Sequence, residues 1–275
     1  MKGLFLRTAL LLFLSFPSLC WGANALVVHD GTAGTNADIL ANLTAKLIAA
    51  AYVITPNVGV PGGPLGGYQQ IWDIRYSNVT PLSGGDIIAY VAYLNGGGSL
   101  FVMGENLAFC LVRDNSIIAL ITAAGGGTPT LASSANSVTI LAPFTNPNAI
   151  ANPFTFLATG GTTYPPGSGE FISKDAANLG SGIVYPPGKL TNALTGSLIV
   201  VFDVNFLLTG ADANSQNLTK NLIAYLAVPG PVPHQPISNG APTLSEWGMI
   251  VMSLLLAGSA IWIIRRRNQA YSQPS

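Results

Sequence analysis

Residues 96–106 have the sequence Gly-Gly-Gly-Ser-Leu-Phe-Val-Met-Gly-Glu-Asn. The run Ser99–Gly104 is apolar at nearly every position and lacks the alternation of a half-exposed strand, so it predicts a strand buried on both faces. The pattern before it is helical, beginning near Ser83 with Asp86 in its first turn and ending at the three glycines. A buried strand that directly follows a helix favours a parallel sheet covered by helices on both faces.

The same alternation of strand and helix patterns extends in both directions from this stretch. Further strands are predicted at Ala25–Val28, Tyr52–Thr55, Ile71–Tyr76 and Leu198–Asp203. Pro56 is expected to end the second of these strands, and Thr35 or Asn36 to cap the helix before it. Another helix is predicted at Gln216–Leu226. We therefore expect residues 26–228 to form an α/β domain with a mostly parallel sheet, as in flavodoxin-like folds.

Residues 125–195 interrupt this alternation because they are rich in Gly, Pro, Thr and Asn. Short strand-like pieces occur at Ser137–Leu141, Phe154–Leu157 and Gly182–Tyr185. We therefore expect a β-rich irregular insertion within the domain.

The composition limits the classes of protein to which the chain can belong. Of its 275 residues, 49% are hydrophobic and 8% are charged, and the formal net charge is zero. The hydrophobic fraction argues against disorder, and the absence of a basic excess argues against nucleic-acid binding. Residues 26–240 have six basic and ten acidic side chains, whereas five basic residues lie near the two ends. A mildly acidic body between basic ends is typical of a chain threaded through a membrane.

The first 25 residues have the pattern of a secretory signal peptide. Lys2 and Arg7 accompany the apolar run Ala9–Leu14, and small residues allow cleavage after either Gly22 or Ala25. We therefore expect the secretion machinery to export the chain.

Cysteine and histidine are rare in this chain, which has two of each. Removal of the signal peptide would leave Cys110 without a disulfide partner, so we expect a small buried side chain there. The remaining residue types do not form a common zinc site, and we predict neither a metal nor a cofactor.

The C-terminal region has the pattern of a membrane anchor. Pro242–Gly248 is followed by the uncharged stretch Met249–Ile264, and we predict a short transmembrane helix over residues 247–264. Three basic residues then fix the end of the chain on the cytoplasmic side, namely Arg265, Arg266 and Arg267. A proline-rich linker at residues 229–240 joins this region to the domain.

Residues 241–268 resemble the C-terminal sorting signals of the bacterial IPTL-CTERM family, relatives of the PEP-CTERM signals. The motif positions are occupied by Pro242, Thr243, Leu244, Trp247 and Gly248. Ala241 stands where the family prefers isoleucine, and residues 269–275 follow as a polar tail. The resemblance implies recognition in the membrane by an exosortase-type transpeptidase. It also implies insertion in the inner membrane during export, followed by transfer to the cell surface or the extracellular space.

The order of elements over residues 26–124 and 196–227 resembles the class I glutamine amidotransferase-like fold. In the enzymes of that family, the turn after the strand at 99–104 carries a nucleophilic cysteine that is assisted by a histidine. Here Glu105 occupies that position, Cys110 comes five residues later, and His234 lies in the linker. The resemblance therefore implies the fold without amidotransferase activity, and we do not expect an enzyme of that type.

Polar residues follow the predicted parallel strands at the edge where ligands usually bind in such sheets. They are His29, Asp30, Asp73, Arg75, Glu105, Asn106, Asp203 and Asn205. One interpretation is structural: the aspartates cap turns, Asp73 pairs with Arg75, and Glu105 meets a helix N-terminus. A second is a ligand cleft without catalysis.

The sequence thus favours an exported bacterial surface protein with a structural or ligand-binding domain, for which surface polysaccharide is one candidate partner. The alternative is an envelope hydrolase that uses Glu105 together with His29 or Asp203 for acid–base chemistry.

Overall fold

The computed structural model describes residues 23–227. The predicted linker, sorting signal and transmembrane helix lie outside this range, as does nearly all of the predicted signal peptide. The elements are β1 (Ala23–His29), α2 (Gly34–Ala49), β2 (Tyr52–Val58), β3 (Gln70–Asp73), α3 (Gly84–Asn95), β4 (Ser99–Gly104), α4 (Leu107–Ala123), β5 (Leu131–Ala132), β6 (Ser137–Ile140), β7 (Phe154–Thr155), β8 (Gly161–Thr162), β9 (Glu170–Lys174), β10 (Gly182–Tyr185), β11 (Ser197–Phe202), the 3-10 helix η1 (Asn205–Leu207) and α5 (Ala213–Leu226).

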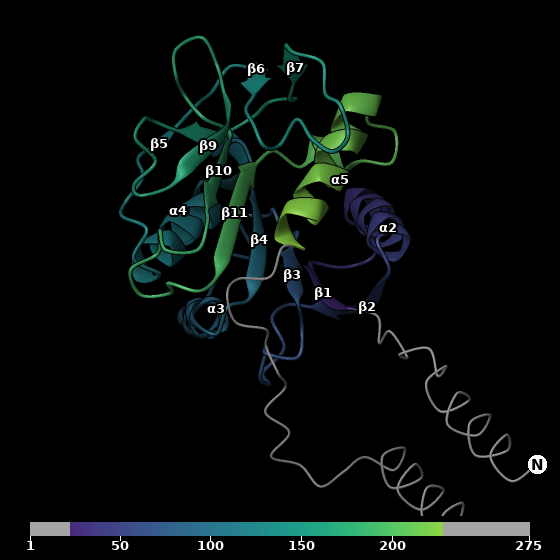
Figure 1. Ribbon diagram of the computed structural model, residues 1–275, viewed down its shortest axis with the longest axis vertical. Helices are drawn as coiled ribbons and strands as arrows, with labels where there is room; N and C mark the ends of the chain where they lie inside the picture. Colours follow the sequence, from purple (N-terminus) through teal and green to yellow (C-terminus); the bar gives the residue numbers. More distant parts are fainter. Residues whose placement is uncertain (1–22, 228–275) are drawn as a thin grey trace, which may run out of the picture. The chain divides into compact units, whose positions relative to one another are not determined.

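Within the described residues, nine strands form one sheet in the order β2-β1-β3-β4-β11-β10-β9-β6-β7 (Figure 1). The first five are parallel to one another, and the last four continue the sheet with antiparallel pairings. Taken alone, the parallel strands have the flavodoxin-like order 2-1-3-4-5. The predicted α/β fold with a mostly parallel core is confirmed, and its strand order is compatible with the glutamine amidotransferase-like resemblance.

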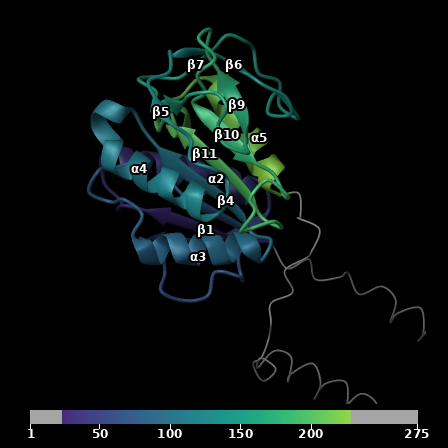
Figure 2. The ribbon, with the colours of Figure 1, turned by 90° about the vertical axis from the view of Figure 1, so that its left-hand side faces the viewer.

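Helices cover both faces of this sheet (Figures 1 and 2). Leu43 of α2 and Leu222 of α5 belong to the hydrophobic cluster on one face. Tyr90 of α3 and Ile117 of α4 belong to the cluster on the other. Because both faces are packed, the central strands are apolar at consecutive positions, as the sequence of β4 predicted.

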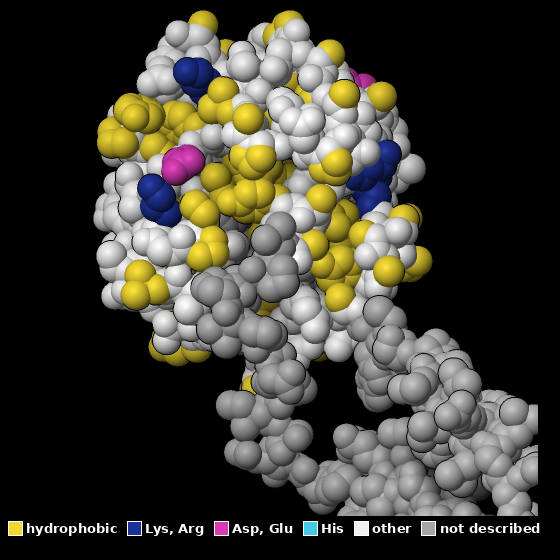
Figure 3. Space-filling view, in the orientation of Figure 1, with side chains coloured by type: hydrophobic (Ala, Val, Ile, Leu, Met, Phe, Trp, Pro, Cys, Tyr) yellow, Lys and Arg dark blue, Asp and Glu magenta, His cyan; other side chains and the backbone are white. Residues whose placement is uncertain are grey.

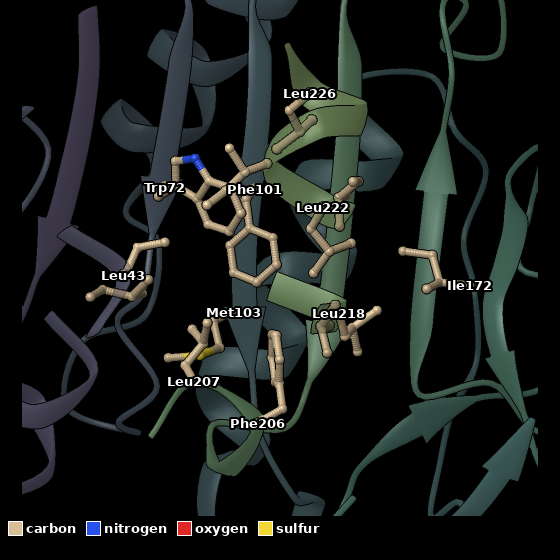
Figure 4. Packing of buried hydrophobic residues seen from close by; sticks show 14 of the residues in the cluster. Leu43, Trp72, Phe101, Met103, Ile172, Phe206, Leu207, Leu218, Leu222 and Leu226 are labelled. Carbon is tan, nitrogen blue, oxygen red and sulfur yellow. The ribbon is translucent and has the colours of Figure 1, made fainter. Parts of the chain in front are cut away.

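Aromatic side chains occupy the centre of the face beneath α5 (Figure 4). Trp72 of β3 stacks on Phe101 of β4 with ring centroids 4.5 Å apart and an interplanar angle of 26°. The indole Nε1 of Trp72 donates to Gln70 Oε1 at 2.8 Å, so its one polar atom is satisfied inside the core. Burial of each such ring contributes about 1.5–3 kcal/mol to folding.

Local sequence explains why several elements begin and end where they do. Ser83 Oγ accepts from Asp86 N at 3.1 Å, and Asp86 Oδ2 accepts from Ser83 N at 3.2 Å, which is a capping box. The predicted start of α3 is therefore confirmed, as are both predicted ends of β4. Asp212 Oδ1 accepts from Ser215 N at 2.8 Å and caps α5, which begins at Ala213, three residues before the predicted start at Gln216.

Two predictions near the N-terminus were wrong. The strand β2 continues past Pro56 to Val58, because it lies at the edge of the sheet where the missing proline N–H leaves no ladder partner unsatisfied. Neither Thr35 nor Asn36 caps α2, since its N-cap is Ala33 and no side chain bonds there.

Other boundaries also differ from the predicted ones. The strand β1 begins at Ala23, inside the predicted signal peptide, because its first residues pair with β2. The strand predicted over Ile71–Tyr76 ends at Asp73. Residues 125–195 contribute β5 to β10, of which β6, β7, β9 and β10 extend the main sheet. No range was predicted for the helix α4, which connects β4 to this segment and whose start was implied only by the expected contact of Glu105 with a helix N-terminus.

Candidate functional site

The eight polar residues predicted at the carboxyl edge do follow the ends of β1, β3, β4 and β11. The structure nevertheless divides them among different roles. Five of them are buried, with relative exposures of 6% or less: His29, Asp73, Arg75, Glu105 and Asp203.

Asp73 is the centre of a buried ion-pair network. Its carboxylate accepts two bonds from Arg75, Nη2 at 2.6 Å and Nε at 2.9 Å, and one from Arg113 Nη2 at 3.0 Å. Tyr90 Oη donates to the same carboxylate at 2.9 Å. Burial alone would raise the pKa of Asp73, but the two guanidinium groups outweigh it and hold that pKa below its ordinary value. The predicted pairing of Asp73 with Arg75 is confirmed, and the cluster is structural.

His29 and Asp30 also make local contacts. His29 Nδ1 accepts from Gly31 N at 3.1 Å, and Asp30 Oδ2 accepts from Thr80 Oγ1 at 3.0 Å. Burial raises the pKa of Asp30. These contacts hold the loop after β1.

Glu105 occupies the turn between β4 and α4. Its Oε1 accepts from Asn106 N and its Oε2 from Val204 N, each at 2.9 Å, so one carboxyl group joins the ends of β4 and β11. Burial, followed by the nearby carboxyl of Asp203, raises the pKa of Glu105 to about 7. The predicted contact with a helix N-terminus is confirmed, since Asn106 is the N-cap of α4.

Gly104 makes this turn sterically feasible. A Cβ at residue 104 would lie 2.6 Å from Asp114 Oδ1 and 2.6 Å from the ring of Phe202. Both groups are fully buried, so any larger residue before Glu105 would force the core to shift.

Two further carboxyl groups lie close to Glu105. Asp114 Oδ1 accepts from Glu105 N at 3.1 Å, while its Oδ2 has no hydrogen-bond partner among the described residues. Asp203 Oδ2 accepts from Leu157 N at 2.8 Å, and its Oδ1 from Asn205 N. Burial raises the pKa of Asp114 to about 7 and that of Asp203 to about 6. The carboxyl edge of the sheet therefore contains three buried carboxyl groups whose pKa values lie near neutral pH.

A pocket of about 420 Å³ opens above Glu105. Only two of the eight predicted residues line it, Glu105 and Asn205. The rest of the lining comes from the first turn of α2, from loops and from the start of α4: Thr35, Tyr76, Ser77, Asn78, Phe109, Cys110, Ala158 and Val204. A second pocket of about 480 Å³, next to η1 and the start of α5, shares Asn205 with it.

Cys110 contributes a buried thiol to this pocket, as predicted for a small buried side chain. Its Sγ contacts the carbonyl oxygen of Tyr76, and its backbone departs from helical geometry (φ −128°, ψ 26°). Burial, with Asp114 and Glu105 nearby, raises the pKa of the thiol to about 12. The group therefore stays protonated and is a poor nucleophile.

Sequence reasoning missed Arg113, Asp114 and Phe109, all of which belong to α4. A signal was present, because Arg113 and Asp114 are the only charged residues in the otherwise apolar or neutral run 107–123. Arg113 is buried because it pairs with Asp73, whereas Asp114 is buried with a single backbone hydrogen bond from Glu105 N.

The described residues contain neither a candidate metal centre nor a candidate membrane span. Among residues 23–227, no group of three or more His, Cys, Asp or Glu side chains is arranged to hold a metal ion. No helix in that range has the length and hydropathy needed to cross a membrane. The predicted span at residues 247–264 and the arginines after it lie outside the described residues.

Known proteins resemble this chain in two separate regions. Residues 242–268 match the IPTL-CTERM motif, which confirms the predicted sorting signal. No curated protein matches the sequence.

The fold of the domain is similar to that of the mmIFT52 N-terminal domain, with a TM-score of 0.52 and 12% identity over 77% of this chain and 100% of that chain. An exo-beta-1,4-mannosidase from Opitutaceae bacterium strain TAV5 has a TM-score of 0.49 and 11% identity over 82% of this chain and 38% of that one. A putative ThuA-like protein from Bacteroides uniformis has a TM-score of 0.46 and 12% identity over 77% and 95% of the two chains. At such identities a likeness concerns the fold alone.

Proposed function

We propose that this chain is an exported bacterial surface protein whose C-terminal signal is recognised in the membrane by an exosortase-type transpeptidase. The match of residues 242–268 to the IPTL-CTERM motif is the observation that carries this proposal. The secretion machinery would deliver the domain to the outside, while the arginines after the apolar stretch stay in the cytoplasm. The tail is then removed and the domain acts at the cell surface or in the extracellular space.

The test is mass-spectrometric mapping of the C-terminus of the protein isolated from its native cells and medium. We expect the chain to end near Pro242–Gly248 and the arginine peptide to be absent. Trp247→Ala should leave the tail uncut, whereas Ser245→Ala, at a variable position of the motif, should be processed normally. A tail that persists through Ser275 in the membrane fraction would refute sorting and leave a plain membrane anchor.

For the domain, we propose a ligand-binding role without catalysis at the pocket above Glu105. The pocket lies at the carboxyl edge of the parallel strands, where ligands bind in folds of this type. Its lining combines apolar surface with neutral polar side chains such as Thr35, Ser77 and Asn205, and Phe109 is 67% exposed. Hydroxyl and amide groups beside an exposed ring suit an uncharged, polyhydroxylated ligand. A segment of surface polysaccharide has this chemistry.

The ionisable groups of the pocket support binding more than turnover. The thiol of Cys110 is protonated, and each carboxyl oxygen of Glu105 already accepts a backbone hydrogen bond. Neither His29 nor Asp203 lines the pocket, so the assisting residues of the predicted hydrolase are not beside the space where a substrate would sit.

Binding can be tested with oligosaccharides released from the extracellular polysaccharide of the native cells. We expect them to raise the melting temperature of the purified protein, and Phe109→Ala to abolish that rise. Ile88→Ala is the matched control, because Ile88 is similarly exposed at 72% but lies on α3 outside the pocket. Equal responses of the two variants would refute binding at this pocket.

A second candidate function is the envelope hydrolase, which one observation favours. Glu105 lines a pocket and has a pKa raised to about 7, a value suited to a general acid at neutral pH. Glu105→Gln keeps the size of the side chain and removes its proton. A hydrolytic activity on cell-surface polymers that this variant lacks would favour the hydrolase over the binding module.

A further inference from the structure

The first three residues of β1 are built into the sheet. Ala23, Asn24 and Ala25 lie in register opposite residues 52–54 of β2. The carbonyl of Asn24 accepts from Gln69 N at 2.9 Å, and its side-chain amide donates to Gly67 O at 3.4 Å. These residues therefore belong to the folded domain, although they also form part of the small-residue pattern that ends the predicted signal peptide.

Leu26, the next residue, would become the N-terminus if cleavage occurred after Ala25. Leu26 is fully buried and pairs with Thr55 of β2 and Ile71 of β3. A chain that began at Leu26 would place its charged α-amino group between these two strands, inside the core. It would also lose the fully buried methyl group of Ala25. An uncompensated buried charge strongly disfavours the folded state.

A chain that begins at Ala23 meets neither difficulty, because Ala23 is only partly buried and Asn24 is exposed. On sequence alone both cuts are allowed, and the predicted signal peptide of 25 residues corresponds to the cut after Ala25. Cleavage after Gly22 has Cys20 and Gly22 as the small residues, and cleavage after Ala25 has Ala23 and Ala25.

We infer that a membrane signal peptidase cleaves the bond between Gly22 and Ala23, so that the mature domain begins with Ala23-Asn24-Ala25. The reaction is a hydrolysis: the C–N bond breaks, the hydroxyl of water remains on the Gly22 carboxyl group, and its proton goes to the new Ala23 amine. It acts on the extended chain during export, before β1 is buried. The inference rests on the export that is part of the proposed function.

The test is the N-terminal mass of the full chain expressed in a bacterial host and recovered from the envelope and medium. A mature chain that begins at Ala23 supports the inference. A mature chain that begins at Leu26 overturns it and leaves export intact. An uncleaved chain beginning at Met1 in the cytoplasm overturns both export and this cut, so the two failures are distinguishable.

A second measurement tests the physical reason. Deletion of Ala23–Ala25 from the full chain joins Gly22 to Leu26, and we expect the product processed at that bond to melt about 10 °C or more below the wild type. The matched control inserts a second Ala-Asn-Ala before Ala23 and keeps the whole of β1. Melting of the deletion variant within about 2 °C of the wild type would overturn the argument from burial.

Discussion

The three carboxyl groups at the edge of the sheet should make the domain less stable as the pH rises, and Glu105→Gln isolates the part due to Glu105. Its pKa is 4.5 when unperturbed and about 7 in the folded protein. Between these values the folded state keeps a proton that the unfolded state has released, so the free energy of unfolding falls as the pH rises towards 7. Below pH 4.5 both states are protonated and the stabilisation is fully present. At 1.36 kcal/mol for each pKa unit, the loss from Glu105 between pH 5 and pH 8 is about 2–3 kcal/mol.

The assay is urea denaturation of the wild type and Glu105→Gln at pH 5 and pH 8. We expect the fall in unfolding free energy between the two pH values to be smaller in the variant by about 2–3 kcal/mol. At pH 5 we expect the free energy of unfolding of Glu105→Gln to be about 1 kcal/mol lower than that of the wild type. The amide NH₂ of the new side chain would face the N–H of Asn106 or Val204, where a carboxyl oxygen accepts in the wild type.

Glu170→Gln serves as the control for Glu105→Gln, because it makes the same substitution at a side chain that is 64% exposed and lies outside the pocket. An identical pH dependence in the wild type and Glu105→Gln would refute the reasoning, since the carboxyl of Glu105 would then ionise as it does in water.

Three further predictions follow from the same part of the fold. Gly104→Ala should lower the unfolding free energy by about 1–3 kcal/mol in denaturant titrations, because its Cβ has no room beside Asp114. Gly62→Ala, where a Cβ meets nothing within 4 Å, should change it little. Asp73→Asn should cost about 3–5 kcal/mol by the same measurement, because it leaves two buried guanidinium groups without their carboxylate. The thiol of Cys110 should resist iodoacetamide at pH 8 in the folded protein and react fully in urea, and rapid alkylation without denaturant would contradict its raised pKa.

The surface of the domain carries few charged side chains, and half of the acidic side chains of residues 26–240 are buried. Figure 3 shows few Lys, Arg, Asp and Glu side chains on the face that it presents, with hydrophobic side chains between them. Of the ten acidic residues at 26–240, five are buried in the domain: Asp73, Glu105, Asp114, Asp175 and Asp203. The near-neutral pKa values at this edge follow from burial more than from repulsion by neighbouring carboxylates.

Much of the fold could be predicted from the sequence because it is set by local patterns. The continuous apolar run Ser99–Gly104 requires burial on both faces, and the capping pair Ser83 and Asp86 starts its helix without help from distant residues. The sorting motif Pro242–Gly248 is likewise a linear signal that is read along the chain.

The site depended on contacts that no local pattern contains. Asp73 and Arg113 are 40 positions apart and meet only because β3 and α4 pack together, which makes the pair structural. Glu105 and Val204 are 99 positions apart, and their bond exists because β4 and β11 are neighbours in the sheet.

The sequence by itself thus determined the class of fold and the C-terminal sorting motif, because periodicity, capping and linear motifs are properties of short stretches of chain. Only the tertiary structure decided which of the eight polar residues line a pocket, which are paired, and where β1 begins. The physical reason is that burial and hydrogen-bond partners set both the pKa of a carboxyl group and the cost of a chain terminus, and both depend on residues brought together by packing.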